Sequence, residues 1–225
     1  MHLVGDDPAK VRGKPGITLW HRVRRTLEPA RSELHLVSPY VVPQQEGADF
    51  LLETASRGVK VRVLTNSLEA TDVAAVHAGY AKWRERLLEA GISLFELKRD
   101  VAEPVVQSGA DSLGSSASSL HAKMFVMDRS LVFIGSCNFD PRSAQLNTEN
   151  GFIIENPALA QMISQTFASR VPQRSYEVRL DEQGALQWIE RRGEEKQVYD
   201  AEPGTSRFRA FFVALLSVLP IDWLL

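Results

Sequence analysis

The feature of the sequence that most constrains the fold is a pair of short apolar runs joined by three turn-forming residues. The runs are 124–127 and 131–134, and Asp128-Arg129-Ser130 lies between them. Apolar runs of this length on either side of polar turn residues predict two adjacent strands. The segment therefore predicts a short hairpin with polar residues at its ends.

The residues that flank this hairpin are polar and regularly spaced. Side chains on a strand alternate between faces, so His121 and Lys123 project on the same side, about 7 Å apart along the chain. Gly135 lets the backbone approach closely, and Ser136 and Asn138 follow with the same two-residue spacing. An imidazole and an ammonium group beside hydrogen-bond donors suit an anionic substrate. No metal-ligand spacing lies nearby, so we expect neither a metal nor another cofactor.

This pattern resembles the signature of the phospholipase D superfamily, His-x-Lys-x4-Asp-x6-Gly-Ser-x-Asn. All of its positions are filled in register, by His121, Lys123, Asp128, Gly135, Ser136 and Asn138. A lone His-x-Lys pair is more often incidental in a buried hairpin, whereas the complete pattern favours membership. Shorter stretches at 38–43, 57–61, 138–143 and 147–149 resemble the carboxy-terminal half of bacterial cardiolipin synthase-like members.

The resemblance implies a fold. It is α/β, a phospholipase D-type α-β-α sandwich with a mixed central sheet, and it is one lobe of a normally two-lobed fold. Family members of this kind are similar to enzymes that carry one His-Lys-Asp motif in each lobe, and the two motifs meet at a shared site. This chain carries a single copy. It would therefore need a second such lobe, or a two-fold axis that brings two copies of His121 face to face.

The resemblance also implies which residues carry the chemistry. It assigns catalytic roles to His121, Lys123, Asp128 and Glu149, and phosphate binding to Ser136 and Asn138. One histidine of the pair forms a phosphohistidine intermediate and the other protonates the leaving alcohol. In a two-lobed enzyme His121 would act as the general acid and then as the base, and Glu149 would orient the imidazole. Asp128 follows a strand end, where a carboxylate secures the hairpin more readily than it performs chemistry.

The rest of the chain alternates between strand-like and helix-like segments. Helices are predicted at 17–31, at 50–56 and from an Asp72 cap to Gly91, and strands at 33–38, 59–65 and 92–97. This order predicts an α/β sheet with crossover helices. After the motif we expect a helical turn opened by Asp140, a strand at 151–154, a helix from Asn156 to about Ser169, and a hairpin at 176–189.

The chain divides into three regions. Residues 1–16 resemble a linker, residues 17–204 form a phospholipase D-like catalytic lobe with one HxKxxxxD motif, and residues 205–225 form an apolar tail. The tail is too short to cross a bilayer. Three interpretations stay open: a helix docked on the lobe, a membrane-surface segment, and an oligomer contact. The small and polar residues at 99–119 form either a solvated connector or a mobile lid.

The amino-acid composition indicates which partners and which cellular compartment to expect. The net charge of −2 provides no basic field, so we expect no nucleic-acid partner. The single cysteine, Cys137, cannot form an internal disulfide, which fits a reducing compartment, and strand alternation predicts a buried thiol. His77 is expected to be a helix residue packed near the sheet rather than a ligand.

The leading hypothesis is a cardiolipin synthase-like phosphatidyltransferase that acts on phosphatidylglycerol-like phospholipids. The resemblance implies a cytoplasmic protein in peripheral contact with the inner membrane. A phosphodiesterase or nuclease active as a homodimer is the first alternative, although the near-neutral charge argues against a basic groove. The second alternative is an inactive lone lobe that only binds lipid or a partner.

Overall fold

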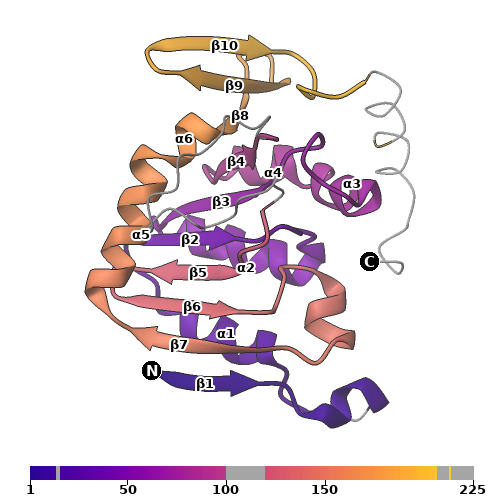
Figure 1. The fold of residues 1–225 in the computed structure, drawn as a ribbon, viewed down its shortest axis with the longest axis vertical. Coiled ribbons are helices and arrows are strands. Elements are labelled where there is room, and N and C mark those ends of the chain that lie inside the picture. The colour runs from indigo at the N-terminus through magenta and orange to yellow at the C-terminus, as the bar shows by residue number, and fades with distance from the viewer. Residues whose placement is uncertain (14–15, 100–119, 207–212, 214–225) are drawn as a thin grey trace, which may run out of the picture.

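The computed structural model of the protein describes residues 1–13, 16–99, 120–206 and 213. Its centre is a ten-stranded sheet with the strand order β1-β7-β6-β5-β2-β3-β4-β8-β9-β10 (Figure 1). The strands are β1 (His2–Gly5), β2 (Glu33–Val37), β3 (Lys60–Asn66), β4 (Ser93–Leu97), β5 (Met124–Met127), β6 (Leu131–Gly135), β7 (Asn150–Glu155), β8 (Ser175–Leu180), β9 (Leu186–Arg192) and β10 (Glu195–Tyr199). The helices are α1 (Leu19–Leu27), α2 (Gln44–Ser56), α3 (Ala74–Ala81), α4 (Arg84–Glu89), α5 (Pro157–Ser169) and α6 (Val171–Arg174), with shorter helical turns at η1 (Pro8–Arg12) and η2 (Arg142–Leu146).

Parallel and antiparallel pairing meet in the middle of this sheet. β2, β3 and β4 are parallel neighbours, connected by α2 and then by α3 with α4. β5 pairs with β2 in the opposite direction, with Met124 opposite Val37, and β6 and β7 continue the antiparallel order. The carboxyl ends of β2 and β3 therefore lie at the same edge of the sheet as the beginning of β5. The predicted mixed sheet and the predicted hairpin are confirmed.

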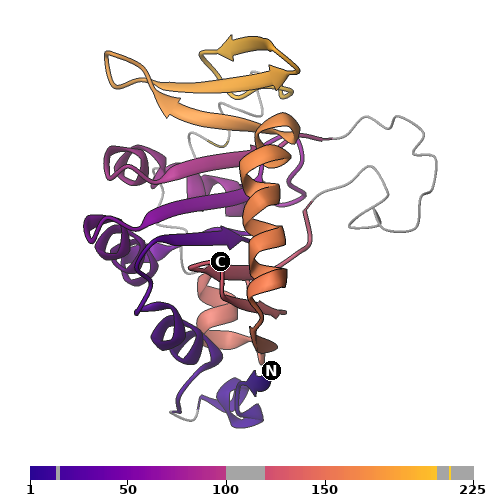
Figure 2. The ribbon, with the colours of Figure 1, turned by 90° about the vertical axis from the view of Figure 1, so that its left-hand side faces the viewer.

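The sheet lies between two helical layers (Figure 2). Helices α1 to α4 cover one face and α5 crosses the other, which confirms the predicted α-β-α sandwich. The larger core lies under α1 and α2, where Trp20 packs against Phe50, Phe125 and Phe139 with ring centroids 5.1–6.3 Å apart. A smaller core around Phe167 lies under α5. Burial of these large side chains supplies most of the hydrophobic contribution that fixes the helices on the sheet.

One carboxylate ties the β5–β6 turn to the start of β2. Asp128 and Arg129 have φ angles of 49° and 52°, as in type I′ hairpin turns. The Asp128 carboxylate accepts hydrogen bonds at 2.8–3.2 Å from the backbone N–H groups of Arg31, Ser32 and Glu33. Burial would raise the pKa of Asp128, but these hydrogen bonds outweigh it and hold the pKa below its usual value.

The amino-terminal residues differ from the predicted linker. β1 adds an edge strand to the sheet by pairing with β7, from His2 opposite Ile153 to Gly5 opposite Asn150. The Asp6 side chain that follows is fully buried and pairs with Lys10 at 2.7 Å. An edge strand needs backbone pairing on one side only, so its sequence carries little of the apolar alternation by which strands are predicted.

Two helices also differ from prediction. The predicted helix from Asp72 to Gly91 is divided into α3 and α4, with the break at residues 82–83. Asp72 does not cap α3, because Val73 holds the cap position and Asp72 instead accepts a hydrogen bond from the Tyr40 hydroxyl at 2.9 Å. α2 begins at Gln44, earlier than predicted, while the predicted start of α5 is confirmed by an Asn156 cap that binds Leu159 N at 3.1 Å.

The predicted connector or lid at 99–119 and the apolar tail at 205–225 lie largely outside the described residues. Val213 is described and is buried against Leu68 and Ala78. None of the helices in the described part of the chain is both long and apolar enough to cross a membrane.

Replacing Asp128 with asparagine should destabilise the fold and make the free energy of unfolding depend less on pH in the acid range. The charged acceptor is lost while three backbone donors remain, so we expect the free energy of unfolding at pH 7 to fall by about 1 to 2 kcal/mol. Because the pKa of folded Asp128 is lowered, its contribution is present above the ordinary value of 3.8 and is lost as the pH falls below it. Urea unfolding at pH 7 and at pH 3 measures both effects.

The matched control is Glu182→Gln, which removes the same charge from an exposed turn. Equal unfolding free energies for Asp128→Asn and the wild type at pH 7 would contradict this role of Asp128.

Candidate active site

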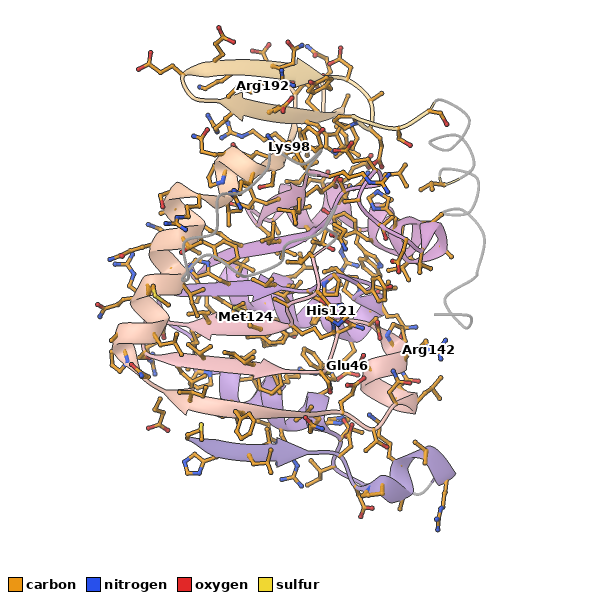
Figure 3. All side chains as sticks on the ribbon, viewed as in Figure 1. Glu46, Lys98, His121, Met124, Arg142 and Arg192 are labelled. Atoms are coloured by element: carbon orange, nitrogen blue, oxygen red, sulfur yellow. The ribbon has the colours of Figure 1, made fainter. Side chains whose placement is uncertain are left out.

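His121 lies at the edge of the sheet where β2 and β3 end and β5 begins (Figure 3). Its side chain is exposed. The preceding residue, Leu120, donates a hydrogen bond to the Asn66 carboxamide oxygen at 2.8 Å and accepts one from the Asn66 amide nitrogen at 3.4 Å. Asn66 is buried at the end of β3, so a neighbouring strand fixes the backbone on which His121 stands.

Lys123 lies beside His121. Its Nζ atom donates a hydrogen bond to the His121 carbonyl oxygen at 2.8 Å. Burial lowers the pKa of Lys123 more strongly than the nearby carboxylates of Glu149 and Asp140 raise it. The imidazole and the amine predicted from the motif are therefore together at one edge, and two carboxylates are close enough to influence the amine.

Two glycines let β6 and β7 approach each other at this edge. Gly135 and Gly151 lie opposite each other in the ladder. A Cβ atom on Gly135 would clash with the Asn150 carbonyl oxygen, and one on Gly151 would lie 2.6 Å from the Phe133 ring. Because backbone and a core ring occupy this space, the motif glycine is required by packing.

Ser136 and Glu149 form a closely bonded pair between β6 and β7. The Ser136 hydroxyl donates a short hydrogen bond to Glu149 Oε2 and accepts one from Asn150 N at 3.1 Å. The second carboxylate oxygen accepts a hydrogen bond from Asn147 Nδ2 at 3.3 Å. Among the described residues, the Glu149 carboxylate bonds to these side chains and not to the imidazole of His121.

The backbone of Glu149 is held by Asp6 in the amino-terminal segment. Glu149 N donates to Asp6 Oδ2 at 2.9 Å, and Asp6 N donates to Glu149 O at the same distance. Lys10 neutralises Asp6 and also donates to the Ser143 carbonyl oxygen at 2.9 Å. The segment that looked like a linker therefore supports a predicted site residue.

Asn138 lies at the start of the connection from β6 to η2. Its backbone N–H donates to the Ser143 hydroxyl at 3.1 Å, and its Oδ1 atom is buried without a hydrogen-bond partner among the described residues. Asp140 accepts a hydrogen bond from Ser143 N at 2.7 Å, as predicted for a residue that opens a helical turn. Burial raises the pKa of Asp140. Cys137 is buried as predicted, and burial raises the pKa of its thiol to about 12.

The structure brings most of the predicted site residues together but separates one of them. The residues at the shared edge are His121, Lys123, Ser136, Asn138 and Glu149. Asp128 lies at the other end of β5, five positions after Lys123, which corresponds to about 16 Å at about 3.3 Å per residue. Its contacts are those of a residue that joins the β5–β6 turn to β2.

A second cluster of titratable groups is buried between α3, α4 and β4. His77, Glu96 and Glu202 offer ligand atoms within 4.8 Å of one another. Arg84 lies among them and forms ion pairs with Glu96 at 3.0 Å and Glu202 at 2.7 Å, so a guanidinium already occupies the place of a cation. The prediction that His77 is a packed helix residue is confirmed, since it is buried and contacts Arg84 and Glu202.

Sequence comparison indicates a family. Residues 23–171 match the model of a family described as "Cardiolipin synthase, PLD-like domain". The chain is 42% identical to cardiolipin synthase C of Escherichia coli strain K12 over 225 residues, which cover 99% of this chain and 48% of that protein. It is 27% identical to cardiolipin synthase A of Buchnera aphidicola (subspecies Schizaphis graminum), over 68% of this chain and 27% of that protein. The chain thus spans about half or less of the length of these curated relatives.

Solved structures share the fold. A phospholipase D family member, Nuc from Salmonella typhimurium, superposes with a TM-score of 0.57 at 18% identity and covers 79% of this chain and 98% of that chain. Phosphatidylserine synthase of Haemophilus influenzae Rd KW20 gives a TM-score of 0.55 at 14% identity, over 88% of this chain and 41% of that chain. At such identities the likeness concerns the fold, and it confirms the predicted phospholipase D-type architecture.

Two positioning residues were missed by sequence reasoning. Asn66 follows directly after the predicted strand at 59–65, and a carboxamide at the carboxyl end of a parallel strand could have marked it. Asp6 carried no signal, because its bond to Glu149 joins residues far apart in the chain.

Replacing Asp6 with alanine should destabilise the protein strongly. Lys10 would remain buried without its partner and Glu149 N would lose its acceptor, so we expect the free energy of unfolding to fall by about 3 to 5 kcal/mol. Chemical denaturation measures the change. Asp7→Ala is the matched control, because Asp7 is exposed and its carboxylate accepts a hydrogen bond only from Ala9 N among the described residues. Equal effects of the two substitutions would contradict a supporting role for Asp6.

Proposed function

The chain belongs to the phospholipase D-like domain family of cardiolipin synthases, and from this premise we propose that it supplies one half of the active site of a phosphatidyltransferase. The observation that carries the proposal is the edge that holds His121, Lys123 and Ser136, since an exposed imidazole and a half-buried amine beside a hydroxyl suit a phosphodiester. A phosphodiester is anionic and repels nucleophiles, so catalysis depends on positioning and charge neutralisation.

An exposed apolar row supports the idea that this half is completed by another lobe. Leu3, Phe152 and Ile134 lie opposite one another across β1, β7 and β6, and their exposed fractions are 70%, 41% and 39%. Met124 continues the row on β5. Large apolar side chains gathered next to a site on a sheet face are typical of a surface that a second lobe or subunit covers. The proposed occupant is a second lobe with its own His-Lys-Asp motif.

The proposed reaction has two steps. One histidine attacks the phosphorus of the donor lipid, the bond from phosphorus to the leaving alcohol breaks, and the other histidine gives its proton to that alcohol. The acceptor alcohol then attacks the phosphohistidine, passes its proton to the second histidine and releases the first. In a two-lobed enzyme His121 is the acid and then the base, whereas in a homodimer the two copies of His121 divide the roles.

The other residues of the edge stabilise charge or position the histidine. Lys123, Ser136 and Asn138 face the phosphoryl oxygens as cation and hydrogen-bond donors. Glu149 holds the Ser136 hydroxyl within the lobe and is proposed to orient an imidazole in the assembled site. Asp128 contributes by fixing the hairpin.

The proposed substrates are phosphatidylglycerol-like lipids, as donor and as the alcohol that accepts the phosphatidyl group. This choice rests on the names of the relatives, several of which are cardiolipin synthases. Such substrates place the protein at a membrane surface, and we propose peripheral contact with the cytoplasmic face of the inner membrane.

A homodimeric phosphodiesterase is the second candidate. It is favoured by the superposition with Nuc, a chain of similar extent that is covered almost completely. The net charge of −2 argues against a nucleic-acid substrate. Light scattering separates the two arrangements, because only the homodimer gives twice the mass of the 25.1 kDa chain without a second lobe.

Replacing His121 with alanine should abolish transfer. The assembled enzyme, with both lobes present, is incubated with phosphatidylglycerol vesicles, and diphosphatidyl lipid is measured in the extract. We expect product formation to fall by about a thousandfold or more, because the residue carries proton transfer. His2→Ala, at an exposed position of β1, is the control. Unchanged turnover by the His121 variant, or no product from the intact enzyme, would refute the proposal.

Replacing Phe152 with aspartate should weaken association of the chain with its second lobe. A charge in a desolvated interface is costly, so we expect at least a tenfold weaker complex, measured by analytical ultracentrifugation. The control is Met162→Asp, which places the same charge at an apolar side chain of α5 that is 57% exposed. Equal loss of association by both variants would show that the exposed apolar row is not the contact surface.

A further inference from the structure

A cavity lies on the face of the sheet that α5 crosses. Its volume is about 370 Å³, and it is lined by Arg62, Arg129, Gln161, Ser164, Gln165 and Ala168. Ligand pockets of proteins begin at about 300 Å³, so a small organic group fits this space. We call the edge with His121, Lys123, Ser136, Asn138 and Glu149 the catalytic edge. None of these residues lines the cavity.

The cavity is remote from the catalytic edge. Arg129 belongs to the β5–β6 turn, which lies at the opposite end of β5 from His121. Arg62 lies near the beginning of β3, whereas Asn66, which positions the catalytic edge, lies at its end. Figure 1 shows the same separation, because α5 crosses the sheet at one side and the beginning of β5 faces the other.

Three side chains of the lining are hydrogen-bond donors without an acceptor among the described residues, namely Arg62, Gln161 and Gln165. Arg62 is half-buried and forms no hydrogen bond or ion pair with the described residues. The Ser164 hydroxyl is buried, with 5% of the residue exposed, and it faces the Glu33 carboxylate, whose pKa it lowers. The side-chain amides of Gln161 and Gln165 are exposed on the same wall. Arg62 and the two glutamine amides are therefore available to donate to a bound acceptor.

The charge around the cavity is positive. Arg129 pairs with Glu33 through two hydrogen bonds at 3.0 and 3.3 Å, so these two charges offset each other. Burial would raise the pKa of Glu33, but hydrogen bonds from Arg129 and Ser164 outweigh it, so the carboxylate stays ionised. Burial lowers the pKa of the adjacent His35 to about 4, which leaves that ring neutral at pH 7. Arg62 therefore remains as a cation without a counter-ion among the described residues.

We propose that this cavity binds a phosphate ester, with Arg62 as the principal anchor. A guanidinium presents a planar array of donors that matches two phosphate oxygens at once, and the exposed amides of Gln161 and Gln165 supply donors for the remaining oxygens. The volume leaves room for a small esterified group, such as glycerol, beyond the phosphate. Free phosphate esters and phospholipid headgroups share this chemistry. The site is distinct from the catalytic edge and does not depend on the proposed transferase activity.

Calorimetry on a chain whose catalytic edge is disabled by His121→Ala and Lys123→Ala tests the proposal. The probes are inorganic phosphate, sn-glycerol 3-phosphate, and vesicles of phosphatidylglycerol in phosphatidylcholine. We expect saturable binding of at least one probe, at least tenfold weaker after Arg62→Gln. Binding of the soluble ester alone assigns the site to free metabolites, and binding of vesicles alone assigns it to lipid headgroups.

Two further variants keep the test decisive. Arg25→Gln removes an equal charge from an exposed position of α1 and should leave the affinity unchanged. Ala168→Phe fills the cavity from its exposed wall without changing charge, and should weaken binding even if Arg62→Gln proves unstable. The proposal is overturned if no probe binds, or if Arg25→Gln weakens binding as much as Arg62→Gln and Ala168→Phe has no effect.

Discussion

The pairing of β5 with β2 is the contact on which the rest of the site depends. β2, β3 and β4 are parallel, and their carboxyl ends lie at one edge of the sheet. β5 pairs with β2 in the opposite direction, so it begins at this edge. Because Met124 lies opposite Val37, the residues just before β5 are placed at the ends of β2 and β3. The Asn66 carboxamide then fixes the backbone of Leu120, so the histidine is positioned by a side chain from another strand.

The groups around this edge are held by partners of their own. Glu149 is bonded to Ser136 through its side chain and to Asp6 through its backbone, and Lys10 neutralises Asp6. A network of this kind stabilises the fold only while every member is satisfied, which explains why the amino-terminal strand and the site form one structure. Groups fixed in advance would need little rearrangement on binding the proposed anionic substrate, and this is the requirement for electrostatic catalysis.

Sequence reasoning succeeded where the controlling contacts are local. The hairpin at 124–134 and the Asn156 cap of α5 depend on residues a few positions apart, and both are confirmed. Tyr80 and Leu87 are apolar residues seven positions apart, which is a helical spacing that continues across residues 82–83, so periodicity could not reveal the break between α3 and α4.

Contacts between distant segments were not predictable in the same way. β1 is an edge strand with little apolar alternation, and its place beside β7 depends on the buried pair of Asp6 and Lys10. In the candidate site, too, local patterns were predictable and contacts between distant segments were not. The motif predicted which side chains share the edge, whereas Asn66 and Asp6 act through bonds to residues far along the chain.

The most direct test of the central claim, that this edge recognises a phosphodiester, is a titration of the chain with dimethyl phosphate followed by NMR of the histidine rings. The account predicts a saturable shift of the His121 resonances that is lost in the Lys123→Ala variant, while the exposed rings of His2 and His21 stay unchanged. A His121 ring that does not respond, or one that responds equally without Lys123, would contradict the account.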